Sequence, residues 1–213
     1  EKIVAATIDL AGRPIDVAYA QKDRIAVVEV ATVCGLHLKR PEDEAFSVHT
    51  RGVGRLVRQV LTTGVSDVFL ALGGTATTDG GLGFLAELGA DLMTETGAPI
   101  AWQTNPLMET KHLRLPAMSV PLHVLADVTA PYAGELGAAS VFGPQKGLTA
   151  SEIVLLDGRL KEIGHRLHIN QIKGAGAAGG LGGAACALGA SIESGAAFIL
   201  RMIHARERMK RAD

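Results

Sequence analysis

The sequence predicts an α/β protein with a mixed sheet and flanking helices. Short runs of apolar, often β-branched residues alternate with amphipathic helical patterns, which is typical of parallel strands joined by helices. Glycine-rich segments lie where a strand or turn meets a helix. The first thirty residues instead hold successive strand patterns on either side of a short turn. Together these three observations favour a sheet with both kinds of strand pairing.

Length and composition exclude several classes of protein. The chain has 213 residues, of which 47% are hydrophobic and 20% charged, so it is neither disordered nor collagen-like. Its formal net charge of −1 favours neither a nucleic-acid nor a membrane partner. No apolar run reaches about 18 residues and no leader pattern opens the chain. With two distant cysteines, Cys34 and Cys186, that form no metal or disulfide pattern, we expect a soluble, cytoplasmic protein.

The first third of the chain reads as strands followed by a helix. Strands are expected at Ile3–Ile8, Ile15–Ala20 and Ile25–Val30, with the turn-forming Ala11–Pro14 between the first two. A helical stripe follows, in which apolar residues recur at i, i+3, i+4, i+7 and i+8. Its members are Val53, Leu56, Val57, Val60 and Leu61.

The middle of the chain predicts an α/β unit. Asp67–Leu72 reads as a buried strand, Gly73–Gly81 as a glycine loop and Phe84–Leu88 as a helix. Ala90–Ser119 is irregular and is expected to hold short strands and loops. Leu122–Ala126 predicts a further strand that ends at Asp127.

The last third predicts mainly helices. Ala138–Phe142 reads as a short helix, and the capping box Thr149–Glu152 opens an amphipathic one. A small-residue helix is expected at Leu181–Leu188, with no convincing strand after it. Ser194 caps a last helix whose end is basic. Its cations are Arg201, Arg206, Arg208, Lys210 and Arg211.

Three segments carry the candidate chemistry. In the first, glycines let the backbone approach an anion, and the hydroxyls and one carboxylate suit phosphoryl transfer, although close strand–helix packing is an equal alternative. Its candidate residues are Gly73, Gly74, Thr75, Thr77, Thr78, Asp79, Gly80 and Gly81. The second segment offers Asp127 at a strand end, and Gln145 with Lys146 as a mobile phosphate contact. A capping aspartate and a solvated lysine are the structural alternatives.

The third segment, Gly174–Gly183, matches the dinucleotide fingerprint through Gly174, Gly176 and Gly179. A lone match is weak evidence, and close packing through alanine and glycine is favoured over a dinucleotide site. Two other functional classes therefore stay open. One is a dinucleotide-dependent oxidoreductase that uses Gly174–Gly179, and the other is a non-catalytic module that binds a small anion.

In order along the chain, these segments resemble the bacterial type-1 glycerate kinase family. LALGGTATTDGGLGFLAELGA (70–90) is similar to the family's glycine loop. ADVTAPYAGELGAASVFGPQKG (126–147) resembles its Asp-Val-x-Asn-Pro segment and Phe-Gly-Pro-Gln-Lys-Gly motif, and GAGAAGGLGGAACALGA (174–190) its glycine–alanine helix start.

The resemblance implies an enzyme that uses ATP and Mg²⁺ to phosphorylate D-glycerate, generally to 2-phosphoglycerate. It implies a fold of two α/β domains, of which residues 1–213 form the inserted one, because the family's Asp-Ser-Phe-Lys-Gly and Thr-Gly-Glu-Gly-Arg motifs are not among these residues. Catalytic roles are then expected for Asp79, Asp127 and Lys146, with Asp127 at the metal and the Asp79 carboxylate facing the cleft. Substrate or phosphate contacts are expected from the remaining candidates, including Gln145, Gly176 and Gly179.

Overall fold

The predicted mixed α/β architecture is confirmed by the structure, a computed structural model that describes residues 1–209. Six strands form one sheet in the order β1-β2-β3-β4-β7-β8. β1 (Lys2–Ile8), β2 (Pro14–Lys22) and β3 (Ile25–Glu29) pair antiparallel, as successive strands joined by short turns do.

The other half of the sheet is parallel. β4 (Asp67–Ala71) pairs with β3, β7 (Leu122–Leu125) with β4, and β8 (Ser191–Glu193) with β7. The strand β8 corrects the expectation that no convincing strand follows the small-residue helix. It has three residues, with Ser191 opposite His123 of β7, and pairing to that neighbour rather than local sequence defines it.

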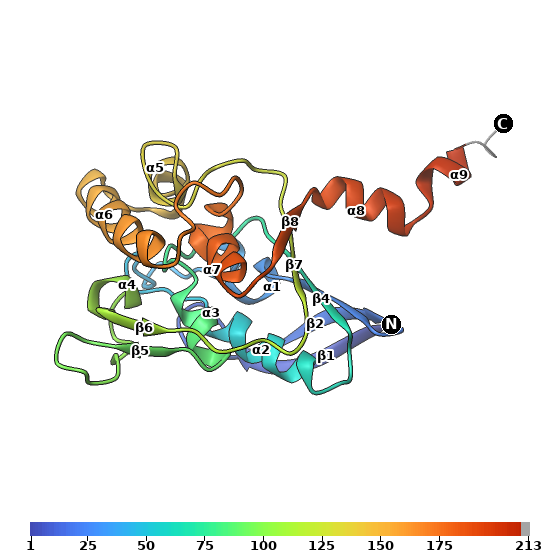
Figure 1. The fold of residues 1–213 in the computed structure, drawn as a ribbon, viewed down its shortest axis with the longest axis horizontal. Helices are drawn as coiled ribbons and strands as arrows, with labels where there is room; N and C mark the ends of the chain where they lie inside the picture. The colour runs from blue at the N-terminus through green and yellow to red at the C-terminus, as the bar shows by residue number, and fades with distance from the viewer. Residues whose placement is uncertain (210–213) are drawn as a thin grey trace.

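Two helices, α2 (Arg51–Leu61) and α7 (Leu181–Ala187), pack on one face of this sheet (Figure 1). α3 (Leu82–Glu87) packs against both of them, and the main core lies between these helices and the sheet. Four of the five residues of the predicted α2 stripe are buried, and Leu61 is half-buried. Two glycines of α2 allow close packing: a Cβ at Gly52 would lie 1.8 Å from the carbonyl oxygen of Ile8. Farther from the sheet lie α4 (Pro106–Glu109), α5 (Ala138–Phe142) and α6 (Ala150–Arg166), the last opened by the predicted capping box.

The opposite face of the sheet carries α8 (Gly195–Met202). Phe198 of this helix packs on Phe69 with ring centroids 4.5 Å apart, and Leu125 completes the small cluster. The predicted last helix is broken, because α9 (Ala205–Met209) begins after a turn at His204, whose φ is 52°. Both helices lead away from the body in Figure 1. Lys210 and Arg211 lie outside the described residues.

Short elements complete the fold. The region Ala90–Ser119 holds a two-stranded sheet of β5 (Asp91–Met93) and β6 (His112–Arg114), as expected. α1 (Ala31–Cys34) and the 3-10 turns η1 (Leu36–Leu38), η2 (Pro144–Lys146) and η3 (Ala177–Gly180) lie in loops. Within residues 1–209, no helix has the length and apolar character that a bilayer crossing requires.

Candidate functional site

The candidate site lies at the carboxyl ends of the parallel strands, where open α/β sheets place their ligands. The glycine loop follows β4, and Asp127 follows β7 two residues beyond its end. Because the strands are parallel and in register, these segments lie at one edge of the sheet. The segments 143–147 and 174–180 come from the helical layer to the same edge.

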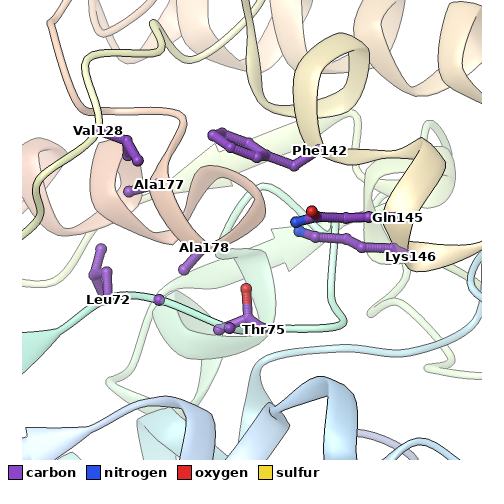
Figure 2. A pocket seen from close by; sticks show the side chains of 10 residues that line it. Leu72, Thr75, Val128, Phe142, Gln145, Lys146, Ala177 and Ala178 are labelled. Carbon is purple, nitrogen blue, oxygen red and sulfur yellow. The ribbon is translucent and has the colours of Figure 1, made fainter.

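The three candidate segments meet in one pocket of about 100 Å³ (Figure 2). Its lining comprises Leu72, Gly73, Gly74, Thr75, Val128, Phe142, Gln145, Lys146, Ala177 and Ala178. In Figure 2 the side chains of Gln145 and Lys146 extend side by side from one turn, and the hydroxyl of Thr75 points into the space between the walls. The structure thus brings five of the sequence-predicted site residues together: Gly73, Gly74, Thr75, Gln145 and Lys146.

The backbone at the start of the glycine loop borders open space. A Cβ added at Gly73 would meet no atom within 4 Å, and at Gly74 the nearest atom would be the Ala31 Cβ at 3.8 Å. Gly74 also has a φ of +61°, which few other residues adopt without strain. The bare peptide groups of this stretch can therefore approach a ligand closely.

The remaining glycines of the two loops serve packing. A Cβ at Gly81 would lie 2.4 Å from that of Ala184, and one at Gly179 would lie 2.0 Å from the Thr77 carbonyl oxygen. At Gly176 the corresponding contact is the Pro131 carbonyl oxygen at 2.3 Å. Gly80 donates its N–H to the Gly179 carbonyl at 3.0 Å. Gly80, Gly81 and Gly179 hold the two loops together, Gly176 packs against the segment after Asp127, and none of the four lines the pocket.

This packing also explains the apparent dinucleotide fingerprint. The segment from Gly174 to Gly179 follows a turn after α6 rather than a strand, so it lacks the strand–loop–helix setting that the fingerprint needs. Glu193, near the spacing of a ribose-binding acid, is ion-paired with Arg201 at 2.8 Å. The structure thus gives no support to a dinucleotide site here.

Lys146 is a buried, fixed cation, neither the mobile phosphate contact predicted from the sequence nor the solvated lysine of the structural alternative. Its side chain is 3% exposed, and Nζ donates to the Thr77 carbonyl at 2.5 Å, with Thr78 Oγ1 at 3.4 Å. Burial lowers the pKa of Lys146 to about 8, an effect partly offset by the negative charge of Asp79. The ammonium group is thus fixed at the pocket wall. Thr77 and Thr78 contact this ammonium group and do not line the pocket themselves.

Asp79 is fully buried, so the expectation that its carboxylate faces the cleft is wrong. Oδ2 accepts from the Thr50 amide at 2.7 Å, the Thr50 hydroxyl at 2.8 Å and the Gly83 amide at 3.2 Å, while Oδ1 accepts from Gly81 at 3.0 Å. Thr50 Oγ1 in turn accepts from the Phe84 amide. The carboxylate therefore ties the start of α3 to the start of α2.

We expect Asp79→Asn to lower the free energy of unfolding by about 3 kcal/mol. An amide nitrogen would replace one of two oxygens that face only donors, which leaves buried donors unpaired. For a chain of this size, that loss lowers Tm by roughly 6–12 °C in a calorimetric scan. The matched control is Asp127→Asn, because Asp127 is exposed. An equal small effect of both changes would contradict this structural role.

Asp127 lies beside the pocket and not in it. Its carboxylate accepts from Ser194 Oγ at 2.7 Å and from the Ala196 amide at 3.3 Å, next to the start of α8. It remains exposed and lines two hollows on either side, one shared with Gly73 and Gly74, the other with Val128 and Phe142. Asp127 can therefore cap α8 and still present lone pairs to a ligand or metal.

Five lining residues were not among the candidates predicted from the sequence: Leu72, Val128, Phe142, Ala177 and Ala178. Alanine carries no chemical signal, but Ala178 has a φ of 52°, in the left-handed region that L residues rarely occupy. Strained backbone of this kind often clusters at ligand sites. The Cβ of Ala178 forms part of the wall facing Gln145 and Lys146 (Figure 2).

Comparison with known proteins identifies the family of the chain. The sequence model described as "Glycerate kinase family" matches residues 1–213. The chain is 38% identical over 205 residues to a glycerate kinase of Halalkalibacterium halodurans, covering 89% of this chain and 53% of the relative. It is 36% identical over 197 residues to a glycerate 2-kinase of Escherichia coli, covering 86% of this chain and 52% of that protein.

A solved structure is similar as well. The crystal structure of a protein provisionally assigned as glycerate kinase 2, from Salmonella typhimurium LT2, superposes with a TM-score of 0.89 at 31% identity, covering 96% of this chain and 59% of that one. The chain spans about half the length of the curated relatives it matches. A family match over the whole chain and these relatives lead to one conclusion: the chain belongs to the glycerate kinase family.

Proposed function

We propose that the complete protein containing this chain is an ATP-dependent glycerate kinase that converts D-glycerate to 2-phosphoglycerate. The observation that supports this most directly is the pairing of open glycine backbone at Gly73–Gly74 with the buried ammonium of Lys146 in one pocket. Peptide N–H groups and a fixed cation suit the phosphates of a nucleotide or the carboxylate of an organic acid. Named relatives at 36–38% identity supply the substrate class.

Each pocket residue has a role in this proposal. The backbone of Gly73 and Gly74 and the hydroxyl of Thr75 donate to an anionic oxygen, and the Gln145 amide orients the same group. Lys146 balances negative charge in a site shielded from water, where a fixed cation has a larger effect than in bulk solvent. Phosphoryl transfer depends mainly on such positioning and charge stabilisation.

Asp127 is the proposed ligand for Mg²⁺. Among the described residues, no three His, Cys, Asp or Glu side chains gather to hold a metal. Mg²⁺ in kinase sites is commonly bound by one or two carboxylates together with substrate phosphates, so one exposed carboxylate beside the pocket fits this mode. When bound, Mg²⁺ neutralises charge on the transferring phosphate.

We further propose that the complete protein has a second domain that closes over this pocket. The relatives are about twice as long as the matched region, and a cleft enzyme divides its contacts between two walls. Free cysteines and the use of ATP favour a cytoplasmic location.

The proposal predicts that the complete protein releases ADP only when ATP, Mg²⁺ and D-glycerate are all present. A coupled ADP assay, with 2-phosphoglycerate identified by mass spectrometry, measures this. A parallel reaction with NAD⁺ in place of ATP should show no change in absorbance at the wavelength of NADH. ADP release that does not depend on glycerate would contradict the proposed substrate.

A further inference from the structure

A short segment after α1 joins the two walls of the pocket. It begins where the Ala76 amide donates to the Cys34 carbonyl and the Leu36 amide to the Gly74 carbonyl, each at 2.8 Å. It ends at Lys39, whose Nζ donates to the carbonyl oxygen of Lys146 at 2.7 Å. The segment 34–39 thus holds the glycine loop at one end and the 143–147 turn at the other.

The carbonyl group that accepts from Lys39 belongs to Lys146, the last residue of η2. The last carbonyls of a helical turn lack internal donors and carry partial negative charge, so a cation is favoured there. Gly147 leaves room for the Lys39 ammonium group, because a Cβ at this position would lie 3.2 Å from Lys39 Nζ. The φ of Gly147, +90°, is also one that residues other than glycine rarely adopt. The Lys39 side chain and the turn that ends at Gly147 are therefore complementary in shape, although Lys39 and Lys146 are 107 residues apart in the sequence.

The backbone bonds within the turn are local. Lys146 and Leu148 donate their amides to the Gly143 carbonyl, and Gly147 donates to Pro144. Two lysine side chains join the turn to other segments: Lys146 Nζ donates to the Thr77 carbonyl of the glycine loop, and Lys39 Nζ donates to the Lys146 carbonyl. Lys39 therefore fixes the peptide from which the Lys146 side chain reaches the glycine loop.

We propose that Lys39 is a positioning residue for phosphoryl transfer, one that holds Gln145 and Lys146 at the correct distance from Gly73–Thr75. This inference rests on the proposed kinase function. Lys39 acts through the peptide of Lys146 and needs no contact with substrate. Misplacement of a catalytic group by about 1 Å can cost up to a hundredfold in rate.

The test compares Lys39→Met and Lys39→Arg in the complete protein. Lys39→Met is expected to lower kcat about tenfold with little change in Tm, because it misplaces Lys146 without removing it. Lys39→Arg keeps a donor for the carbonyl and should recover most of the loss. The matched control is Lys22→Met, an exposed lysine opposite Ile25 at the far end of the sheet.

Coupling to Lys146 separates positioning from an independent role. If Lys39 acts through Lys146, adding Lys39→Met to Lys146→Met should lower kcat little further. Fully additive losses, or an unchanged kcat in Lys39→Met, would overturn the inference.

A readout without catalysis distinguishes failure of this inference from failure of the kinase proposal. Lys39→Met should increase amide hydrogen exchange in residues 143–148, and Lys22→Met should not. If the wild-type protein releases no ADP, the kinase proposal fails and the exchange result still decides on Lys39. Unchanged exchange in Lys39→Met would refute the role of Lys39 in placing the turn.

Discussion

Lys146→Met in the complete protein is expected to lower kcat/KM for glycerate phosphorylation by about a hundredfold or more. The lost group is a cation fixed by Thr77 at the wall of the pocket. In surroundings that exclude water, charge stabilisation of the transferring phosphate is strong and cannot be replaced by solvent. Methionine fills most of the volume of the lysine stem, so the variant should keep its fold.

The measurement is steady-state ADP release with a thermal scan of the same sample. Lys22→Met again serves as the control, since it removes one positive charge far from the pocket. A Lys146→Met protein with near-normal kcat/KM and unchanged Tm would assign Lys146 no part in catalysis or binding. A similar loss of activity in Lys22→Met would attribute the effect to the net charge of the protein and not to a cation in this pocket.

The pH dependence of activity and stability gives Lys146 a distinctive signature. Its pKa is lowered to about 8 by burial, against an ordinary value of 10.5. The charged form is lost as pH rises through 8, so kcat/KM should fall above that pH in the wild type and stay flat in Lys146→Met. Between about pH 8 and 10.5 the unfolded chain binds the proton and the folded chain does not, so this group makes folding more favourable as pH rises.

Local sequence patterns were sufficient for most of the elements. The apolar run at Asp67–Leu72 and the stripe of α2 bury side chains in the way that their periodicities predict. β8 was missed because its three residues include one apolar side chain between two polar ones, and its pairing with β7 is a nonlocal contact. The break between α8 and α9 has no glycine or proline to mark it.

The candidate site was predictable as a set of segments but not residue by residue. Gly73 and Gly80 stand in one loop and look alike in sequence. Gly73 faces open space. Gly80 lies against Tyr132, whose hydroxyl oxygen would be 2.5 Å from a Cβ added at Gly80. Which glycine meets a ligand depends on the residue packed against it, and Tyr132 is 52 residues from Gly80 along the chain. The burial of Asp79 was not predicted for the same reason, because its main hydrogen-bond partner, Thr50, is distant in the sequence.

Residues 1–213 alone are expected to fold and to release no measurable ADP from ATP and glycerate. Folding is expected because one continuous core spans the antiparallel strands, the parallel strands and the helical layer. Catalysis is not expected, because the pocket offers only the Lys146 ammonium, the Gln145 amide, two peptide groups and a hydroxyl, with Asp127 at its margin. In-line transfer needs nucleotide, metal and acceptor held together.

The experiment measures coupled ADP release from this chain and from the complete protein under the same conditions, with circular dichroism and a thermal scan to establish that the chain is folded. We expect a cooperative thermal transition and at least a 10³-fold lower rate, on the order of the loss when positioning and electrostatic contacts are removed together. Weak binding of nucleotide or glycerate is compatible with this, because the Gly73–Thr75 backbone and Lys146 are already in place. A rate comparable to that of the complete protein would show that residues 1–213 hold every group the reaction needs, and the second wall would then have no catalytic part.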